Sequence, residues 1–402
     1  MGNRWPVVIS ALIVAGCTAQ ADPAVKPAGP AKADRAAAVA GQRHAYFGEL
    51  HLHTSYSFDA WGLMATKTTP DDAYRFGKGE GVTYDGKVIH RAWPLDFMAV
   101  TDHSENMGLL NALDDPNSDL SKSEIGQTIR KDTSKSFYML REANAQGRTI
   151  PGLDPAAAAK TAWAKEVAAA NANYQPGKFT TFIAYEWSQM NEGKFNLHRN
   201  VFFSGDKAPL PWTSVDSPRP EDLWTYLEKN RAQGVEALAI PHNGNASNGL
   251  MYDWNMSDGR PIDQAYAERR ARNEPLTEVI QNKGQSETLP ELSPNDEFAN
   301  FEIYDVLITQ RDTKGKVNGS YIRQAFGRGL VIQKKVGTNP YKYGLVGASD
   351  WHNGISTSDE NATAGTPGGI DPNVNLPDGD AAPKLLGIIQ TRAMIDDNAA
   401  KA

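Results

Sequence analysis

The chain has 402 residues, 40% of them hydrophobic and 22% charged, which is typical of a globular protein with room for one large α/β domain or two ordinary ones. Its formal net charge is -7 and its pI is near 5.7. This charge excludes the basic footprint of a nucleic-acid-binding protein, so we expect no nucleic-acid partner. An anionic substrate would have to be attracted by a local site.

The N-terminus has the pattern of an export signal. Arg4 precedes a nine-residue apolar run, "VVISALIVA" at 7–15, which is too short to span a membrane and fits a signal-peptide core. The run leads into "VAGC", ending at Cys17, the one cysteine of the chain. This motif resembles a bacterial lipobox, in which the cysteine is lipidated. The alternative is an ordinary secretory signal, and both place the protein outside the cytoplasm. We predict a lipoprotein signal at 1–17 and a membrane-anchored lipoprotein of the periplasm or outer membrane.

Residues 18–43 are mainly Ala, Pro and small polar residues without apolar periodicity, and they predict a flexible tether. The remaining residues, 44–402, predict one catalytic domain. The chain ends soon after "LLGIIQTRAMI", which leaves open a reading frame truncated at its C-terminus.

From residue 46 onward, short β-like runs alternate with helical stretches, which predicts a parallel sheet or barrel covered by helices. Asp154 is expected to cap a helix that starts at Pro155, and a second helix is expected from Pro220 to a stop at Gly234. The expected strands are Tyr46–His51, Leu95–Thr101, Thr180–Tyr185, Arg199–Phe203, Ala237–Ile240, Phe301–Tyr304, Tyr343–Ala348 and Leu386–Ile395. Two stretches, 60–94 and 257–297, look like insertions that shape a cleft.

Metal-ligand residue types gather at the ends of these strands. "YFGELHLHTSYSFDA" carries His51 and His53, which share one face of a strand because side chains alternate along it. The other candidates follow or precede later strands: Asp102, His103, Glu186, His198, His242, Asp350 and His352. One such histidine is usually structural, but six of the eight histidines lie in these positions. Since strand ends of a parallel α/β fold form one rim, these side chains are expected to meet there.

The order of these residues resembles a known superfamily. H-x-H, Asp59, T-D-H, a strand-end Glu, His, P-H and D-x-H are similar to the PHP (polymerase and histidinol phosphatase) metallophosphoesterases, from about Tyr46 to His352. Within that superfamily, "YFGELHLHTSYSFDA" and "VGASDWH" look like the bacterial group DUF3604. The resemblance implies a distorted (β/α)7 barrel with the metal site at the C-terminal strand ends.

The resemblance also implies a ligand set for two to three divalent ions. One ion would be held by His51, His53, Glu186 and Asp350, a second by Glu186, His198 and His242, and a third by Asp59, His103 and His352. Asp59 stands where other members have histidine. Mixed imidazole and carboxylate ligands suit Zn, Mn or Fe.

Other residues next to the ligands are candidates for supporting roles. Asp102 and Glu49 are expected to orient imidazoles through their free N–H groups. Arg199 and Asn243 are candidates for binding phosphate oxygens, with a salt bridge and a turn residue as the alternatives. We assign the catalytic roles to Asp350, His352 and Arg199.

The function expected from this set is hydrolysis of a small phosphate ester by a metal-activated water. The chain shows no P-loop, no G-x-S-x-G motif and no catalytic-cysteine pattern. Two alternatives remain: an amidohydrolase-like hydrolase of a non-phosphate bond, and a non-catalytic metal- or ligand-binding lipoprotein. The expected partner is a small anionic substrate, with membrane contact only through a lipid at Cys17. The sequence does not indicate the oligomeric state.

Overall fold

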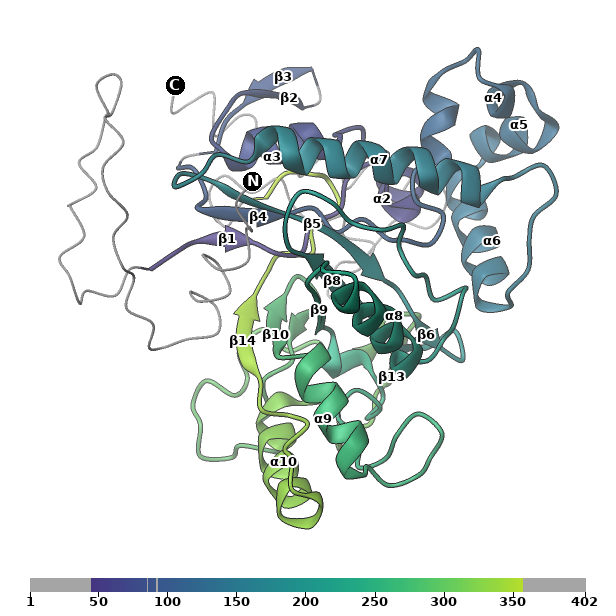
Figure 1. Cartoon of the computed structure of the whole chain (residues 1–402). Coiled ribbons are helices and arrows are strands. Elements are labelled where there is room, and N and C mark those ends of the chain that lie inside the picture. The colour runs from purple at the N-terminus through teal and green to yellow at the C-terminus, as the bar shows by residue number, and fades with distance from the viewer. Residues whose placement is uncertain (1–44, 85, 92, 357–402) are drawn as a thin grey trace.

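The computed structural model describes residues 45–356 except 85 and 92 (Figure 1). The expected signal at 1–17, the tether at 18–43 and the strand at 386–395 lie outside the described residues. So does the C-terminal stretch on which the question of truncation depends.

The described residues form a mixed α/β domain built on two sheets. The larger sheet has the order β1-β4-β5-β8-β9, and the smaller has the order β11-β10-β14. Their strands are β1 Gly48–Glu49, β4 Phe97–Ala99, β5 Thr180–Trp187, β8 Arg199–Phe203, β9 Ala237–Pro241, β10 Leu276–Gln281, β11 Gly284–Gln285 and β14 Gly344–Gly347. Three short hairpins complete the strands: β2 Val82–Tyr84 with β3 Lys87–Ile89, β6 Met190–Asn191 with β7 Phe195–Asn196, and β12 Val306–Leu307 with β13 Gln310–Lys314.

The helices begin and end at the signals that the sequence carries. The Asp154 side chain accepts a hydrogen bond from the Ala157 N–H, as expected for the cap of a helix that begins at Pro155. The helix from Pro220 ends before Gly234, whose φ of 83° needs a residue without a Cβ. The α-helices described are α2 Phe58–Met64, α3 Pro70–Gly77, α4 Asp119–Lys122, α5 Glu124–Lys131, α6 Thr133–Ala145, α7 Pro155–Asn173, α8 Pro220–Ala232, α9 Gln264–Asn273 and α10 Ile322–Val336, with 3-10 turns at Leu110–Asp114 and Gly244–Ala246.

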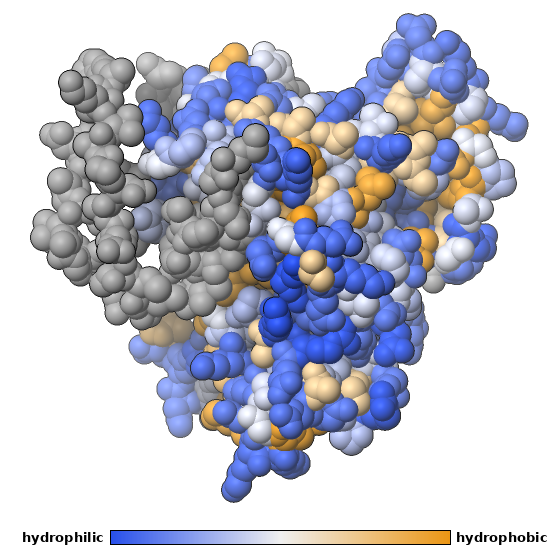
Figure 2. Space-filling view, viewed as in Figure 1, coloured by the Kyte–Doolittle hydropathy of each residue, from blue (hydrophilic) through white to orange (hydrophobic). Residues whose placement is uncertain are grey.

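Helices cover the outer faces of both sheets. In Figure 1, α3 and α7 lie across the larger sheet near β4 and β5, whereas α9 and α10 lie beside the smaller sheet. Tyr74 of α3, Trp163 of α7 and Leu223 of α8 pack in one buried cluster with Tyr185 and Val201 of the sheet. The helices α4, α5 and α6 form a separate lobe, on which apolar residues gather in Figure 2. This covering explains why the central strands are apolar on both faces.

The inner faces of the two sheets share a second apolar cluster. It contains Phe182, Phe202 and Leu238 from the larger sheet and Leu276 and Val346 from the smaller one. The sheets also approach at both edges. A parallel bridge joins Leu52 to Trp351 beyond β1 and β14, and the Thr277 hydroxyl of β10 donates to the carbonyl of Pro241 in β9. Across the described residues these contacts leave two sheets, and the ladders do not close into one barrel.

Two expectations about the strands are wrong. The sheet is not wholly parallel, because β8 runs antiparallel to both β5 and β9. Residues 301–304 form a turn and an irregular segment, and the short strand β12 follows at Val306. The alternation of helices and strands did not reveal either feature, since a short β5–β8 connection can reverse the chain without a helix.

The two expected insertions contain regular structure. Residues 60–94 include most of α2, all of α3 and the β2–β3 hairpin. The stretch 257–297 is not a loop insertion, because it supplies α9 and the sheet strand β10. The sequence did not predict β10, because this strand carries the polar residues Glu278 and Gln281 at positions that are buried in the fold.

Candidate metal centre

The candidate site caps the inner apolar cluster at one end of the strands. Along β5, Phe182 and Ala184 face this cluster, and the next residue with the same orientation is Glu186. Along β9, Leu238 and Ile240 lead in the same way to His242. Because β8 is antiparallel, its order is reversed, and the inward series ends at His198 just before the strand begins. The strand reversal therefore places His198 at the same end as the others.

His51, His53, Glu186 and Asp350 form the first group of ligand-type atoms, and all four residues are buried. Nε2 of His51 lies 3.1 Å from Glu186 Oε2 and 3.3 Å from Asp350 Oδ1. Nε2 of His53 lies 3.2 Å from the same two oxygens. Four atoms bound tetrahedrally at about 2.1 Å from a zinc ion would be about 3.4 Å apart. The four measured separations are therefore those of a compact metal-binding group.

Glu186 also serves a second group, with His198 and His242. Its Oε1 lies 2.5 Å from Nδ1 of His198, and its Oε2 lies 3.6 Å from Nε2 of His242. Nε2 of His198 and Nδ1 of His242 are buried and have no hydrogen-bond partner in the described structure. One carboxylate thus joins two groups through its two oxygens.

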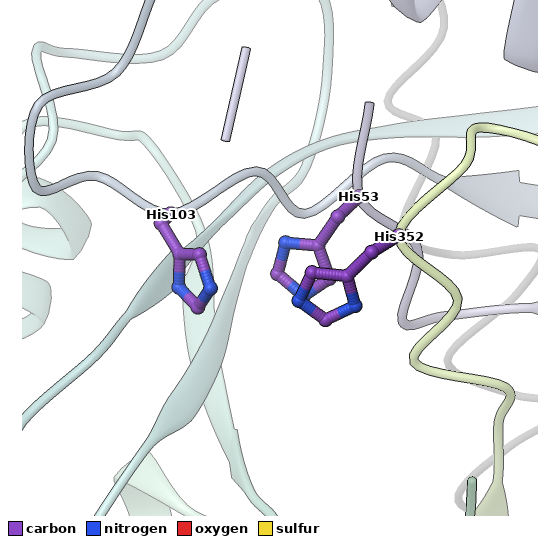
Figure 3. Close-up of side chains that lie close together, drawn as sticks. All are labelled: His53, His103 and His352. Carbon is purple, nitrogen blue, oxygen red and sulfur yellow. The ribbon is translucent and has the colours of Figure 1, made fainter. Parts of the chain in front are cut away.

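A third group surrounds Asp59, at the start of α2. Its Oδ2 lies 3.1 Å from Nε2 of His103 and 3.0 Å from Nε2 of His352. The rings of His53 and His352 are stacked with their centroids 4.1 Å apart, and the ring of His103 lies 4.4 Å from that of His53 and 5.9 Å from that of His352 (Figure 3). The three histidines follow β1, β4 and β14, which are far apart in the sequence.

Hydrogen bonds to Nδ1 fix several of these rings. Nδ1 of His53 lies 2.9 Å from Ser57 Oγ, and the Ser57 hydroxyl donates to Asp102. Nδ1 of His352 lies 2.9 Å from the carbonyl oxygen of Asp350. A ring that donates from Nδ1 keeps its Nε2 lone pair for a ligand, and in both residues Nε2 faces the group of carboxylates.

Burial favours the neutral form of some of these imidazoles, whereas nearby carboxylates raise the pKa of His51 and His103 against the effect of burial. Burial and the neighbouring His352 and His103 hold the pKa of His53 well below its usual range, and burial together with His51 does the same for the pKa of His242. Neutral imidazole is the form that binds metals. Four carboxylates, those of Asp59, Glu186, Glu278 and Asp350, lie in or against these groups. Because buried carboxylates need compensating charge, this donor set fits divalent cations.

Comparison with known protein families supports the resemblance to DUF3604. The family model described as "Protein of unknown function (DUF3604)" matches residues 40–386. The chain belongs to the DUF3604 family. No curated protein and no solved structure matches it.

The structure of this DUF3604 chain brings together all nine side chains that the sequence singled out as ligands. It also adds two residues that the sequence analysis missed, both in or next to β10. Glu278 Oε2 lies 2.8 Å from Nδ1 of His51, and Lys283 contacts Asp350. A Leu-x-Glu alternation, with Leu276 facing the inner cluster, is the one signal that could have identified Glu278. Burial lowers the pKa of Lys283 to about 8, against the charges of Glu186, Asp59 and Glu278.

The residues expected to support the ligands act in different ways. Asp102 reaches His53 through Ser57, so it does orient an imidazole. Glu49 instead accepts from the backbone N–H groups of His51 and Ser349, and so holds two ligand-bearing segments together. Glu278 is the carboxylate that contacts the imidazole of His51.

The two candidates for phosphate binding differ as well. Arg199 forms an ion pair with Glu274, its Nε 3.0 Å from Oε1, and its guanidinium lies over the ring of Trp187. Adjacent strand residues point to opposite faces, so Arg199 turns away from the face that carries His198, and the structure supports the salt-bridge alternative. Asn243 has a left-handed backbone with φ 51°, and its buried Nδ2 has no hydrogen-bond partner within residues 45–356 as described.

Among the helices that the structure describes in this DUF3604 chain, none has the length and apolar character needed to cross a membrane. The family match, the cluster geometry and the unpartnered nitrogen atoms are the observations on which a function can be argued.

Proposed function

We propose that this protein is an extracytoplasmic, metal-dependent phosphoesterase that hydrolyses small phosphate esters. The observation that carries the proposal is the convergence of imidazole and carboxylate groups from distant strands around Glu186, with 3.1 to 3.3 Å between the donor atoms of the first group. Two to three ions would be held there, by His51, His53, Glu186 and Asp350, by Glu186, His198 and His242, and by Asp59, His103 and His352. Mixed nitrogen and oxygen donors suit Zn, Mn or Fe.

Bound ions supply two things for this reaction: positive charge for phosphoryl oxygens, and a lower pKa for a water molecule. The residues of the chain would hold the ions and orient the ligands. Ser57 and Glu278 hold the rings of His53 and His51, and so keep their Nε2 atoms aimed at the carboxylates. Within the sequence no serine or cysteine nucleophile motif is evident, which supports water as the attacking group.

The proposal includes a PHP-type barrel as the architecture. Seven strands, in the spatial order β1, β4, β5, β8, β9, β10 and β14, surround the inner apolar cluster. Support for a distorted, nearly closed arrangement comes from the parallel bridge between Leu52 and Trp351 and from the contact between Thr277 and Pro241. In such an arrangement one rim collects residues from every strand, as ligand clusters require.

The proposed location outside the cytoplasm rests on the sequence alone, through the apolar run and the lipobox-like cysteine at 17. A phosphoesterase in that location would act on small exogenous esters. The net negative charge of the chain does not attract anions, so the metal site would have to supply the positive charge that attracts the substrate.

The test is turnover of aryl phosphomonoesters and phosphodiesters by purified protein with added Mn or Zn. Wild type is compared with His53→Ala, and His90→Ala, which removes an exposed imidazole outside the groups, is the matched control. We expect metal-dependent turnover by wild type and His90→Ala and its loss in His53→Ala.

Two results would contradict the proposal. Hydrolysis of an amide or carboxylic ester without any phosphoester turnover would favour the amidohydrolase-like alternative. Metal binding without hydrolysis of any of these substrates would favour the non-catalytic binding protein.

A further inference from the structure

Lys283 is a lysine held inside the candidate site. It lies in the turn between β10 and β11, and the whole residue is 7% exposed, whereas lysine is almost never buried without a role or a partner. The turn is tight, because it leaves two residues between β10 and β11, and it packs closely against another segment, since a Cβ on Gly284 (φ 79°) would lie 2.6 Å from the Glu302 carbonyl oxygen. The position of Lys283 is therefore fixed by the backbone.

A network of side-chain amides attaches this turn to Asp350. Nε2 of Gln281 donates to Asp350 Oδ2 at 2.5 Å and to Asn243 Oδ1 at 3.0 Å. Nδ2 of Asn282 donates to the carbonyl oxygen of Asp350 at 2.6 Å. The loop that carries Asp350 and the turn that carries Lys283 thus form one unit, and the lysine side chain cannot move far without disturbing a ligand.

The two oxygens of Asp350 have separate partners. Oδ2 accepts from the ammonium of Lys283 and the amide of Gln281. Oδ1 faces Nε2 of His51 and His53 and has no hydrogen bond among the residues that the structure describes. Lys283 therefore lies beside the first group without occupying the space between its donor atoms. Within the described part of the chain, Asp350 is the one hydrogen-bond partner of its Nζ, and an ammonium has three donors.

We propose that Lys283 binds the anionic group of the substrate next to the metal centre. The inference rests on the proposed phosphoesterase function, and it assigns to Lys283 the phosphate-binding role that was expected of Arg199. Arg199 is buried and already paired with Glu274, on the strand face opposite to His198, so its charge is directed away from the site. Asn243, which the Gln281 amide connects to the same network, is a second donor for the anion, because its Nδ2 has no partner in the described part of the chain.

The probe is inorganic phosphate, and its affinity for the metal-loaded protein is measured by calorimetry. Lys283→Gln removes the charge and keeps a polar chain, Lys283→Arg keeps the charge, and Lys334→Gln in the exposed last turn of α10 is the control for a loss of net charge. A charge-assisted hydrogen bond is typically worth about ten- to a hundredfold in affinity. We expect a loss of this size in Lys283→Gln, partial recovery in Lys283→Arg and no change in Lys334→Gln.

Metal content and kinetics separate this role from a structural one. The metal content of Lys283→Gln should equal that of wild type, and its KM for a phosphoester should rise more than its kcat falls. Loss of metal in Lys283→Gln would overturn the inference, since the lysine would then only hold Asp350 in place. Phosphate affinity within twofold of wild type would overturn it too.

The proposed function can fail independently. If wild type hydrolyses phosphoesters and Lys283→Gln has the same KM and phosphate affinity, only the role of Lys283 is refuted. If wild type binds phosphate through Lys283 but hydrolyses no ester, the phosphoesterase is refuted and the anion site stands.

Discussion

Glu186 is the residue whose replacement should affect the candidate centre most. It is 1% exposed, and it belongs to both the group with His51, His53 and Asp350 and the group with His198 and His242. Glu186→Gln keeps the size of the side chain but removes its charge and one acceptor oxygen. The second group is then left with two imidazoles and no carboxylate, and the first group loses one of its four donors.

The magnitude follows from binding linkage. An ion at a free concentration of one hundred times its Kd stabilises the folded state by about 2.7 kcal/mol, so two ions that share Glu186 contribute about 5.4 kcal/mol together. In Glu186→Gln we expect these two sites together to contribute less than about 0.5 kcal/mol, since a site with Kd raised about a thousandfold is only about one-tenth occupied and gives less than about 0.1 kcal/mol.

The assay compares the free energy of unfolding from urea titrations with and without metal, for each variant separately. Any effect of the substitution on the metal-free fold cancels in this comparison. Elemental analysis of the same samples should show two fewer ions per chain in Glu186→Gln. The matched control is Glu221→Gln in α8, a buried glutamate that accepts hydrogen bonds from Ser257 and takes no part in the groups. If Glu186→Gln keeps the metal content of wild type, the assignment of Glu186 as a shared ligand is wrong.

Three further outcomes test the description of the chain. Cys17→Ala should leave the protein uncleaved or release it from the membrane fraction, and identical fractionation of both proteins in the soluble fraction would contradict the anchor. Arg199→Ala should destabilise the fold by about 1.5 to 3 kcal/mol in urea titrations, because the buried Glu274 loses one charge-assisted hydrogen bond. Glu274 keeps its ion pair with Arg270 and the hydrogen bond from Trp224, and a change below about 0.5 kcal/mol would show that the pair with Arg199 is unimportant. Burial and the charge of Asp102 raise the pKa of Glu166 well above its usual range. The contribution of Glu166 to the free energy of unfolding is therefore fully present below the unfolded carboxyl pKa of about 4.3, and it is lost as pH rises through the folded pKa. The stability advantage of Glu166→Gln over wild type should therefore grow between pH 5 and 8, and a constant difference would contradict the raised pKa.

The sequence by itself determined which residues could form a metal centre. Imidazole and carboxylate groups at the ends of apolar strands are visible without a structure, because strand length and alternation are local properties. His51 and His53, two residues apart, were expected to share one face because side chains alternate along an extended chain, and both lie just beyond β1. The caps of α7 and α8 were equally local, since a helix begins and ends on interactions within a few residues.

The tertiary structure decided the roles of the remaining side chains. The sequence could not show that β8 runs antiparallel, although this orientation places His198 at the same end as the other ligands. Alternation along the strand then turns Arg199 to the opposite face, where it pairs with Glu274. Glu278 and Lys283 lie in a polar stretch that reads as a loop, because charged residues are normally exposed. They are buried only because β10 pairs with β14, and this pairing brings their charges against His51 and Asp350. Contacts between residues about 70 to 230 positions apart leave no local pattern, so only the folded chain reveals them.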